Sequence, residues 1–459
     1  PDADASYFRG RFYSDKAPGS SMLAAVVYRF ARVFAAPRDF TIEELVHLMR
    51  RCLMLPFALL GFGLLRALLR RVGTSEPSVD IASLALMLGT AAFHYSVAFY
   101  GHFLVTVMLL ASLWLLMGED RRRRWPSLLA SGAAAGLAGM TEYQGIVAAA
   151  LLFVFVLFRE RRRPSGIAAF ALGAAPFAAA LLAYNEAAFG GPFEFSFEHL
   201  ADSRLQDHPH RGFAGIVEPS AKGALLALFS PTRGLITTAP IVVLFPVGLI
   251  ALARREDGAF ALLLGAHVAY FLAFAFGVET RLLGSGFGPR LLVPSFGALF
   301  LAVGPALDVF ARSALLSGIA RGLAIWGVVY SAAITETFPE LPPEFLNPLA
   351  DVVLPALERG MHAPNLATLA GSRFGVATLY PAWVLTMLAA LAIALRGLSR
   401  FASLSRSGLA LALSLALPLG LPIASAKVFE RFGPTSGLNA QRSVLDRMSE
   451  QIRLEEQAR

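Results

Sequence analysis

Residues 52–71 read CLMLPFALLGFGLLRALLRR, an apolar run that ends on two arginines. A membrane-spanning helix needs about 20 mostly apolar residues, and this run supplies them. Similar runs recur along the chain, so the sequence predicts an all-α fold, a polytopic bundle of transmembrane helices. The twelve expected spans are 52–69, 81–99, 101–117, 126–141, 143–158, 166–184, 236–252, 258–277, 290–309, 316–335, 375–395 and 408–425.

The composition leads to the same class. Of the 459 residues, 56% are hydrophobic and 16% are charged, whereas about 25% of an ordinary soluble domain is charged. A water-soluble core cannot bury this much apolar surface, so most of it must face lipid. Disorder, collagen-like repeats and a disulfide scaffold are excluded as well. A single cysteine, Cys52, rules out an intramolecular disulfide, and we expect it to be a small buried apolar residue.

Arginines gather in short clusters between the apolar runs, and the net charge is +8. Such clusters are typical of the cytoplasmic loops of membrane proteins, and here they argue against a nucleic-acid surface. If Arg70 and Arg71 are cytoplasmic, strict alternation of the spans places the later arginine-bearing loops on the same side. Those loops are 119–124, 159–165, 253–257, 311–315 and 396–407.

The opposite, exterior side collects most of the polar sequence. Residues 19–36 are apolar but carry Arg29 and Arg32, whose charges are costly at the centre of a membrane helix. We therefore expect an amphipathic helix in the outer interface there. The expected division is an outer segment 1–51, a transmembrane bundle 52–425 with long outer loops at 185–235 and 336–374, and a polar tail helix at 426–459.

Two polar stretches at the outer ends of apolar runs carry acidic residues. Asp15 and Lys16 stand in a turn-rich segment. A lysine at a membrane surface can bind phosphate as a point charge, or it can anchor to lipid headgroups. Glu142 and Tyr143 stand at the outer turn of an apolar hairpin. A carboxylate there is costly unless it is paired or hydrated, which indicates a functional group, although a solvated turn explains it equally well.

Two further stretches place an arginine beside glycine and proline just before a span. They are the segments 229–235, with Arg233, and 284–290, with Arg290. Glycine lets a ligand approach the backbone closely, and the arginine fork suits phosphate. The alternative is an interfacial arginine anchor. No strand precedes the second stretch, so it is not a nucleotide-binding glycine loop.

The histidines give little indication of a metal site. His208 and His210 are two residues apart beside Asp207, while His94 and His102 flank an outer turn. The sequence has no HExxH or CxxC pattern and no GxSxG elbow. We therefore expect neither a bound metal nor a resident cofactor.

The motifs and their order resemble a known superfamily of membrane enzymes. Asp15-Lys16-Ala17-Pro18 resembles the (D/E)KPP region of the GT-C glycosyltransferases, with alanine where proline is common. The branch that looks nearest contains the dolichyl-phosphate-mannose protein mannosyltransferases and the lipid A aminoarabinose transferase. The resemblance covers about residues 10–310. Other matching features are Gly89-Thr90 with His102 downstream, Thr141-Glu142-Tyr143, Ser230 to Leu235 and Gly288 to Pro294.

The resemblance implies a transferase whose donor substrate is a polyprenyl-phosphate sugar, bound at the outer membrane face. By this resemblance, Lys16 is the residue that contacts the donor phosphate. Asp15 is the candidate catalytic residue, which activates the acceptor or holds the lysine. The family's principal catalytic acid lies further before the lysine than this chain extends, so we expect it and a thirteenth span upstream of Pro1. The other candidate substrate-binding residues are His102, Glu142, Tyr143, Arg233 and Arg290.

The implied partners are the lipid-linked sugar, membrane lipids and an acceptor that is a protein, a glycolipid or a polysaccharide, with no nucleic acid. The expected location is a bacterial inner membrane, with the site facing the periplasm or exterior. One alternative is a transporter or lipid flippase, which predicts charges in the middle of spans. Another is a non-catalytic scaffold that docks a protein partner through the tail 426–459, and a third is an O-antigen ligase or polymerase.

Overall fold

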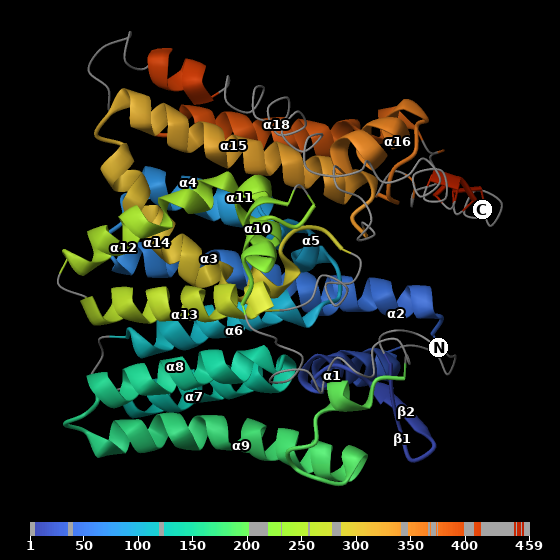
Figure 1. Cartoon of the computed structure of the whole chain (residues 1–459), viewed down its shortest axis with the longest axis vertical. Helices are drawn as coiled ribbons and strands as arrows, with labels where there is room; N and C mark the ends of the chain where they lie inside the picture. The colour runs from blue at the N-terminus through green and yellow to red at the C-terminus, as the bar shows by residue number, and fades with distance from the viewer. Residues whose placement is uncertain are drawn as a thin grey trace.

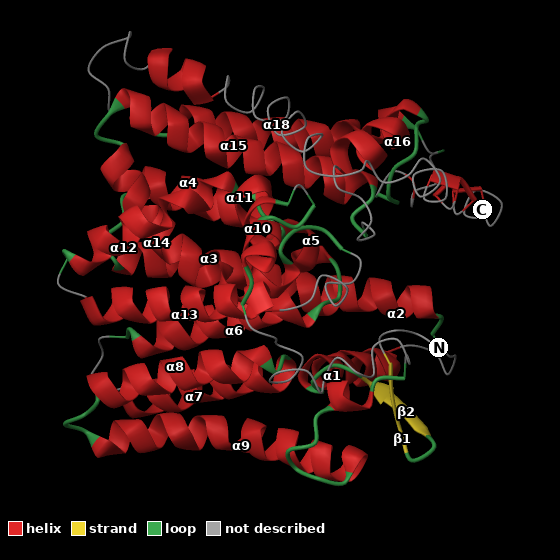
Figure 2. Ribbon diagram, in the orientation of Figure 1, coloured by secondary structure: helices red, strands yellow, loops and turns green. Residues whose placement is uncertain are grey.

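A computed structural model shows a bundle of helices with one short hairpin at its end (Figures 1 and 2). Helices and one strand pair make up the regular structure of the ranges described, so the expected all-α fold is confirmed, with the hairpin as an addition. The structure describes residues 5–34, 40–118, 124–201, 219–230, 232–255, 258–277, 286–340, 348–365, 375–398 and 408–414, together with a few isolated residues beyond these ranges.

The order of the elements follows the chain from the hairpin into the bundle. The first elements are β1 (Ala5–Phe8), β2 (Arg11–Ser14), α1 (Gly19–Phe34), α2 (Ile42–Met49), the π-helix η1 (Arg50–Met54), α3 (Leu55–Arg71), α4 (Glu76–Leu88), α5 (Ala92–Val97), α6 (Gly101–Leu116), α7 (Arg124–Thr141), α8 (Gln144–Arg159) and α9 (Pro164–Phe189). The later elements are η3 (Ser196–His199), α10 (Ala221–Phe229), α11 (Leu235–Thr238), η4 (Pro240–Leu244), α12 (Phe245–Ala253), α13 (Gly258–Gly277), η6 (Arg290–Ser295), α14 (Phe296–Phe310), α15 (Ala314–Thr337), η7 (Leu349–Val353), α16 (Leu354–Glu358), η8 (Val376–Leu379) and α18 (Tyr380–Leu395).

Several of these helices have the length and apolar character of membrane spans. Within the described residues, six stretches qualify: Ile42–Arg71, Pro164–Phe189, Gly258–Gly277, Arg290–Phe310, Ala314–Thr337 and Ala377–Leu395. Three shorter apolar helices are Gly101–Leu116, Gln144–Arg159 and Pro240–Ala253. All nine coincide with expected spans, so the membrane bundle is confirmed, while the count of twelve stays a prediction. The expected span 408–425 lies largely outside the described residues.

The first span begins earlier than the sequence indicated. Thr41 caps the helix reciprocally with Glu44, and α2, η1 and α3 then run on without a break. A capping box satisfies amide groups that would otherwise be orphaned, which fixes the start of the helix. Cys52 lies in η1 and is exposed, so the expectation that it is buried was wrong.

The expected span 81–99 is divided into α4 and α5. The Thr90 hydroxyl donates to Leu86 O at 2.7 Å and accepts from Ala92 N at 3.0 Å, which caps both helix ends at the turn. A Cβ on Gly327 would lie 2.3 Å from Gly89 O, so the end of α4 packs tightly on α15. The break directs α5 toward the end of the bundle that carries α1 and α16 (Figure 1).

The hairpin β1–β2 was not anticipated from the sequence. Its strands are antiparallel, with Ala5 opposite Ser14. Arg9 and Gly10 form the turn with positive φ angles of 48° and 80°, the geometry that a two-residue hairpin loop requires. Ala201 N donates to Ala5 O at 2.8 Å, which ties the hairpin to the segment after α9.

Helix α1 matches the expected interfacial helix. Only Gly19 is buried along its length, while Val26, Phe30 and Val33 are exposed together with the arginines Arg29 and Arg32. Exposed apolar side chains beside arginines suit a helix that lies in the headgroup boundary.

The arginines of the expected cytoplasmic side are paired with acidic residues. Arg70 Nε lies 2.7 Å from Glu76 Oε1. Asp80 lies between two arginines, 2.6 Å from Arg66 and 2.6 Å from Arg396. These pairs link α3, α4 and the end of α18 at one end of the bundle.

Glycines let α7 and α9 approach closely. A Cβ on Gly132 would lie 1.9 Å from Phe170 O, and one on Gly173 would lie 1.9 Å from Leu129 O. Small residues at such contacts are how membrane helices gain close backbone packing.

We predict that Gly132→Leu lowers the thermal midpoint of the detergent-solubilised protein. Overpacking costs about 1–3 kcal/mol, which corresponds to a decrease of roughly 1–3 °C for a chain of this size, because the unfolding entropy grows with chain length. The matched control is Gly63→Ala in α3, where a Cβ would meet nothing within 4 Å. Equal midpoints for both variants would show that this contact does not limit stability.

Candidate outer-face site

The loop after β2 carries Asp15 and Lys16, whose side chains form an ion pair. Lys16 is anchored through its backbone: its amide donates to Ser14 Oγ at 3.2 Å, and its carbonyl accepts from Ser196 Oγ at 3.4 Å. Asp15 Oδ1 is buried and has no hydrogen-bond partner among the described residues. One carboxylate oxygen is therefore available to a ligand.

Gly19, the first residue of α1, determines the position of the loop that carries Asp15 and Lys16. A Cβ on Gly19 would lie 2.7 Å from Met140 O and from the Thr141 backbone, so the start of α1 packs directly on the end of α7. Ala17 and Pro18 are buried in the same contact. As a result, Lys16 lies beside the turn between α7 and α8.

Glu142 occupies that turn and reaches over the start of α6. A Cβ on Gly101 would lie 2.2 Å from Glu142 Oε1, so only glycine leaves room for the carboxylate. His102 Nδ1 lies 3.5 Å from Glu142 Oε1 and 3.5 Å from Gln144 Nε2. The positive end of a helix dipole favours a carboxylate at this place.

The charge state of Glu142 is balanced between opposing effects. Burial raises the pKa of its carboxyl to about 7, against the positive charges of Lys16 and Arg290, which lower it. Asp15 adds a further upward contribution. Because Lys16, Arg290 and Asp15 all act on this one carboxyl, the structure brings these predicted residues together around Glu142.

Tyr143 is held in place by residues of the segment that follows α9. Its hydroxyl lies 3.0 Å from Ser196 Oγ, and its ring packs against Phe195 and Phe197. Since Ser196 holds the Lys16 carbonyl, Tyr143 supports the lysine loop. Its predicted contact with substrate remains a prediction.

Two hydrogen-bonded turns present Arg233 and Arg290. Gly288 N donates to Thr232 O at 2.9 Å, which joins the turns. Gly288 has a φ of 70°, and a Cβ there would lie 2.6 Å from Ala91 Cβ, so both its backbone angle and its surroundings require glycine. Arg290 Nε is buried without a hydrogen-bond partner among the described residues.

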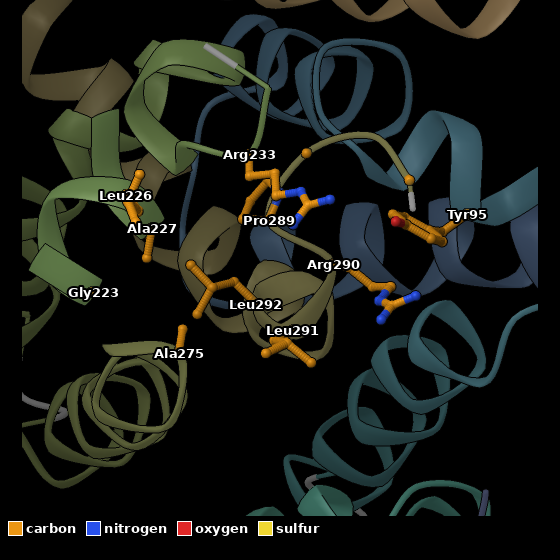
Figure 3. Close-up of a pocket in the computed structure, with 12 residues that line it drawn as sticks. Tyr95, Gly223, Leu226, Ala227, Arg233, Ala275, Pro289, Arg290, Leu291 and Leu292 are labelled. Carbon is orange, nitrogen blue, oxygen red and sulfur yellow. The ribbon is translucent and has the colours of Figure 1, made fainter. Parts of the chain in front are cut away.

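The two arginines line a cavity that is partly open to solvent. Figure 3 shows Arg233, Arg290 and the Tyr95 hydroxyl around one part of it. Apolar side chains form the other walls, so the cavity has a cationic part and an apolar part. The apolar lining consists of Leu226, Ala227, Ala275, Leu291 and Leu292.

Sequence reasoning missed several polar residues beside this cavity. Tyr95 lines it, and Tyr100 and Glu340 lie next to Tyr95. His94 was noted only as flanking an outer turn. The aromatic residues around that turn were a usable signal, but Glu340 stands in a long polar loop with no local pattern.

Among the described residues, no group of three or more His, Cys, Asp or Glu side chains could hold a metal ion. Asp207, His208 and His210 lie outside the described residues.

Comparisons with known proteins found similarity at the level of structure. The structure of ArnT from Cupriavidus metallidurans in the apo state shares 19% identity with a TM-score of 0.49, over 92% of this chain and 68% of that chain. The ArnT structure bound to undecaprenyl phosphate shares 16% identity with a TM-score of 0.43. The match covers 93% of this chain and 72% of that chain. No protein-family model and no curated protein matches the chain.

Both TM-scores lie below 0.5, so this similarity carries no weight for the chemistry. The function proposed below therefore rests on the chain's own side chains.

We predict that Glu142 makes stability depend on pH near neutrality. Its pKa is raised from about 4.5 to about 7 on folding, so the folded state binds the proton more tightly than the unfolded state. The associated stability is complete below pH 4.5, falls as the pH rises toward 7 and then levels off. Thermal midpoints measured across this window should show the fall in the wild type.

The comparison protein is Glu142→Gln, which keeps the shape and removes the titration. Its midpoint should lack this component of the pH dependence. Parallel curves for the two proteins would contradict the raised pKa of Glu142.

Proposed function

We propose that the chain is a membrane glycosyltransferase that transfers a sugar from a polyprenyl-phosphate donor to an acceptor at the extracytoplasmic face. The cavity that joins Arg233 and Arg290 to an apolar wall carries the proposal. A polyprenyl phosphate has the same division, because its phosphate is anionic and its chain is apolar. Arginine forks suit phosphate oxygens, and leucine and alanine surfaces suit the chain.

The donor phosphate lies, in this proposal, between Arg290 and the Lys16 ammonium. Both cations act on the Glu142 carboxyl, which supports their closeness. Lys16 is 43% exposed and pairs with Asp15, so a phosphate oxygen can compete for it. The chain of the lipid leaves along Leu226 and Ala275 toward the membrane.

The reaction is a displacement at the anomeric carbon of the sugar. The acceptor oxygen bonds to that carbon, the bond to the phosphate oxygen breaks, and the electron pair leaves with the polyprenyl phosphate. Lys16 and Arg290 stabilise the charge of the leaving phosphate. The acceptor proton passes to a carboxylate, for which we propose Asp15, whose Oδ1 is buried and unpartnered. The donor carries its own leaving group, so the proposal includes no resident cofactor or metal.

The remaining predicted residues complete the site in this proposal. His102 and Glu142 bind substrate on the carboxylate side, and Tyr143 supports the Lys16 loop. The paired arginines at the opposite end of the bundle support an exterior placement of the site. We propose a bacterial inner membrane, with a protein, glycolipid or polysaccharide as acceptor, and the tail 426–459 as a surface for a protein partner.

We predict that Lys16→Ala loses most of its affinity for undecaprenyl phosphate. Removing a charged hydrogen-bond partner costs about 1.5–3 kcal/mol, which corresponds to roughly a tenfold loss or more. Native mass spectrometry of the detergent-solubilised protein, titrated with this lipid, measures the loss directly.

The matched control is Arg11→Ala, which removes an exposed cation from the same hairpin. It should bind the lipid as the wild type does. Equal binding by Lys16→Ala and wild type would make Lys16 a headgroup anchor, and failure of the wild type to bind would favour the transporter or scaffold alternatives.

A further inference from the structure

A second polar cluster, formed by Glu340, Tyr100 and His94, lies beside Tyr95, and the charge of Arg290 acts on it. Glu340 follows α15, and both of its carboxylate oxygens accept from the Tyr100 hydroxyl, at 3.2 and 3.3 Å. His94 Nε2 lies 3.5 Å from Glu340 Oε1. The three residues come from α5, the start of α6 and the end of α15, so the fold alone assembles them.

Tyr95 connects this cluster with the cavity. Its ring lies edge-on to Tyr100, with centroids 5.2 Å apart, and edge-on to His102, at 6.1 Å. The Tyr95 side chain is 1% exposed, and its hydroxyl has no hydrogen-bond partner among the described residues. Figure 3 shows this hydroxyl pointing into the space that Arg233 and Arg290 border. A buried donor without a partner is costly, so this hydroxyl is suited to a ligand.

The carboxylate of Glu340 is held ionised and accessible. Burial favours its neutral form, but the hydrogen bond from Tyr100, the nearby His94 imidazole and the charge of Arg290 outweigh burial and lower its pKa. The side chain nevertheless remains 45% exposed. If Glu340 only anchored the end of α15, its contact with the Tyr100 hydroxyl would be sufficient. Because the Glu340 carboxylate is also ionised and exposed, it can accept hydrogen bonds from a ligand.

We infer that Tyr95, Tyr100 and Glu340 form the subsite for the transferred sugar, which they recognise through its free hydroxyl groups. Glu340 accepts from sugar hydroxyls, the Tyr95 hydroxyl donates to a sugar or linking oxygen, and the Tyr100 ring packs on the sugar. This inference rests on the proposed function, because a sugar joined to a phosphate at Arg290 and Arg233 would reach these side chains.

The test compares bare undecaprenyl phosphate with its glucosyl, galactosyl and mannosyl derivatives, competed against one another in native mass spectrometry. The wild type should prefer at least one derivative over the bare lipid by roughly tenfold, the gain expected from one hydrogen bond to a charged group. Glu340→Gln, which changes the acceptor of the sugar hydroxyls, and Tyr100→Ala, which removes the ring, should both lose this preference and bind the bare lipid as the wild type does.

The matched control is Glu336→Gln, four residues earlier on α15, which should keep the preference. Three outcomes overturn the inference: no preference for any derivative in the wild type, a preference that survives Glu340→Gln, or loss of bare-lipid binding in that variant. In the last case Glu340 supports the fold. If the wild type binds neither the bare lipid nor any derivative, the proposed function itself fails, which separates the two conclusions.

Discussion

The cost of charge in an apolar surrounding organises the outer end of this protein. A buried carboxylate or ammonium is unfavourable unless an opposite charge or a strong hydrogen bond compensates it. Glu142 therefore requires Lys16 and Arg290 nearby, and Glu340 requires Tyr100, His94 and Arg290. The charge of Arg290 acts on both carboxylates, so this one arginine couples the two polar clusters electrostatically.

Close backbone approach is the second requirement of the site. Gly19 lets α1 meet the end of α7, and Gly101 leaves room for the Glu142 carboxylate. Gly288 lets the Arg290 turn meet the end of α4 and the start of α5. A methyl group on Gly101 would meet the Glu142 carboxylate itself, whereas one on Gly19 or Gly288 would push against the neighbouring segments that place Lys16 and Arg290.

The sequence predicted the helices well because apolar length and arginine clusters are local properties. The same logic found Lys16, Glu142, Arg233 and Arg290, since charged residues at the ends of apolar runs are conspicuous. The Glu340 cluster could not be found in this way, because its members are 240 residues apart and meet only through the break between α4 and α5. The orientation of Tyr143 was also out of reach, since the aromatic residues beyond α9 determine it.

The short connection between Lys16 and α1 bears on how deep the Lys16 ammonium lies in the membrane. Helix α1 exposes the apolar and arginine side chains that suit the headgroup boundary, and only the buried Ala17 and Pro18 separate its first residue, Gly19, from Lys16. A helix α1 placed in that boundary would therefore set the depth of the ammonium from the bilayer surface and not from the centre of the bundle. A lipid phosphate is positioned by that same surface. Membranes of different thickness would move the bundle relative to the lipid, yet the cation and the phosphate would stay level with each other.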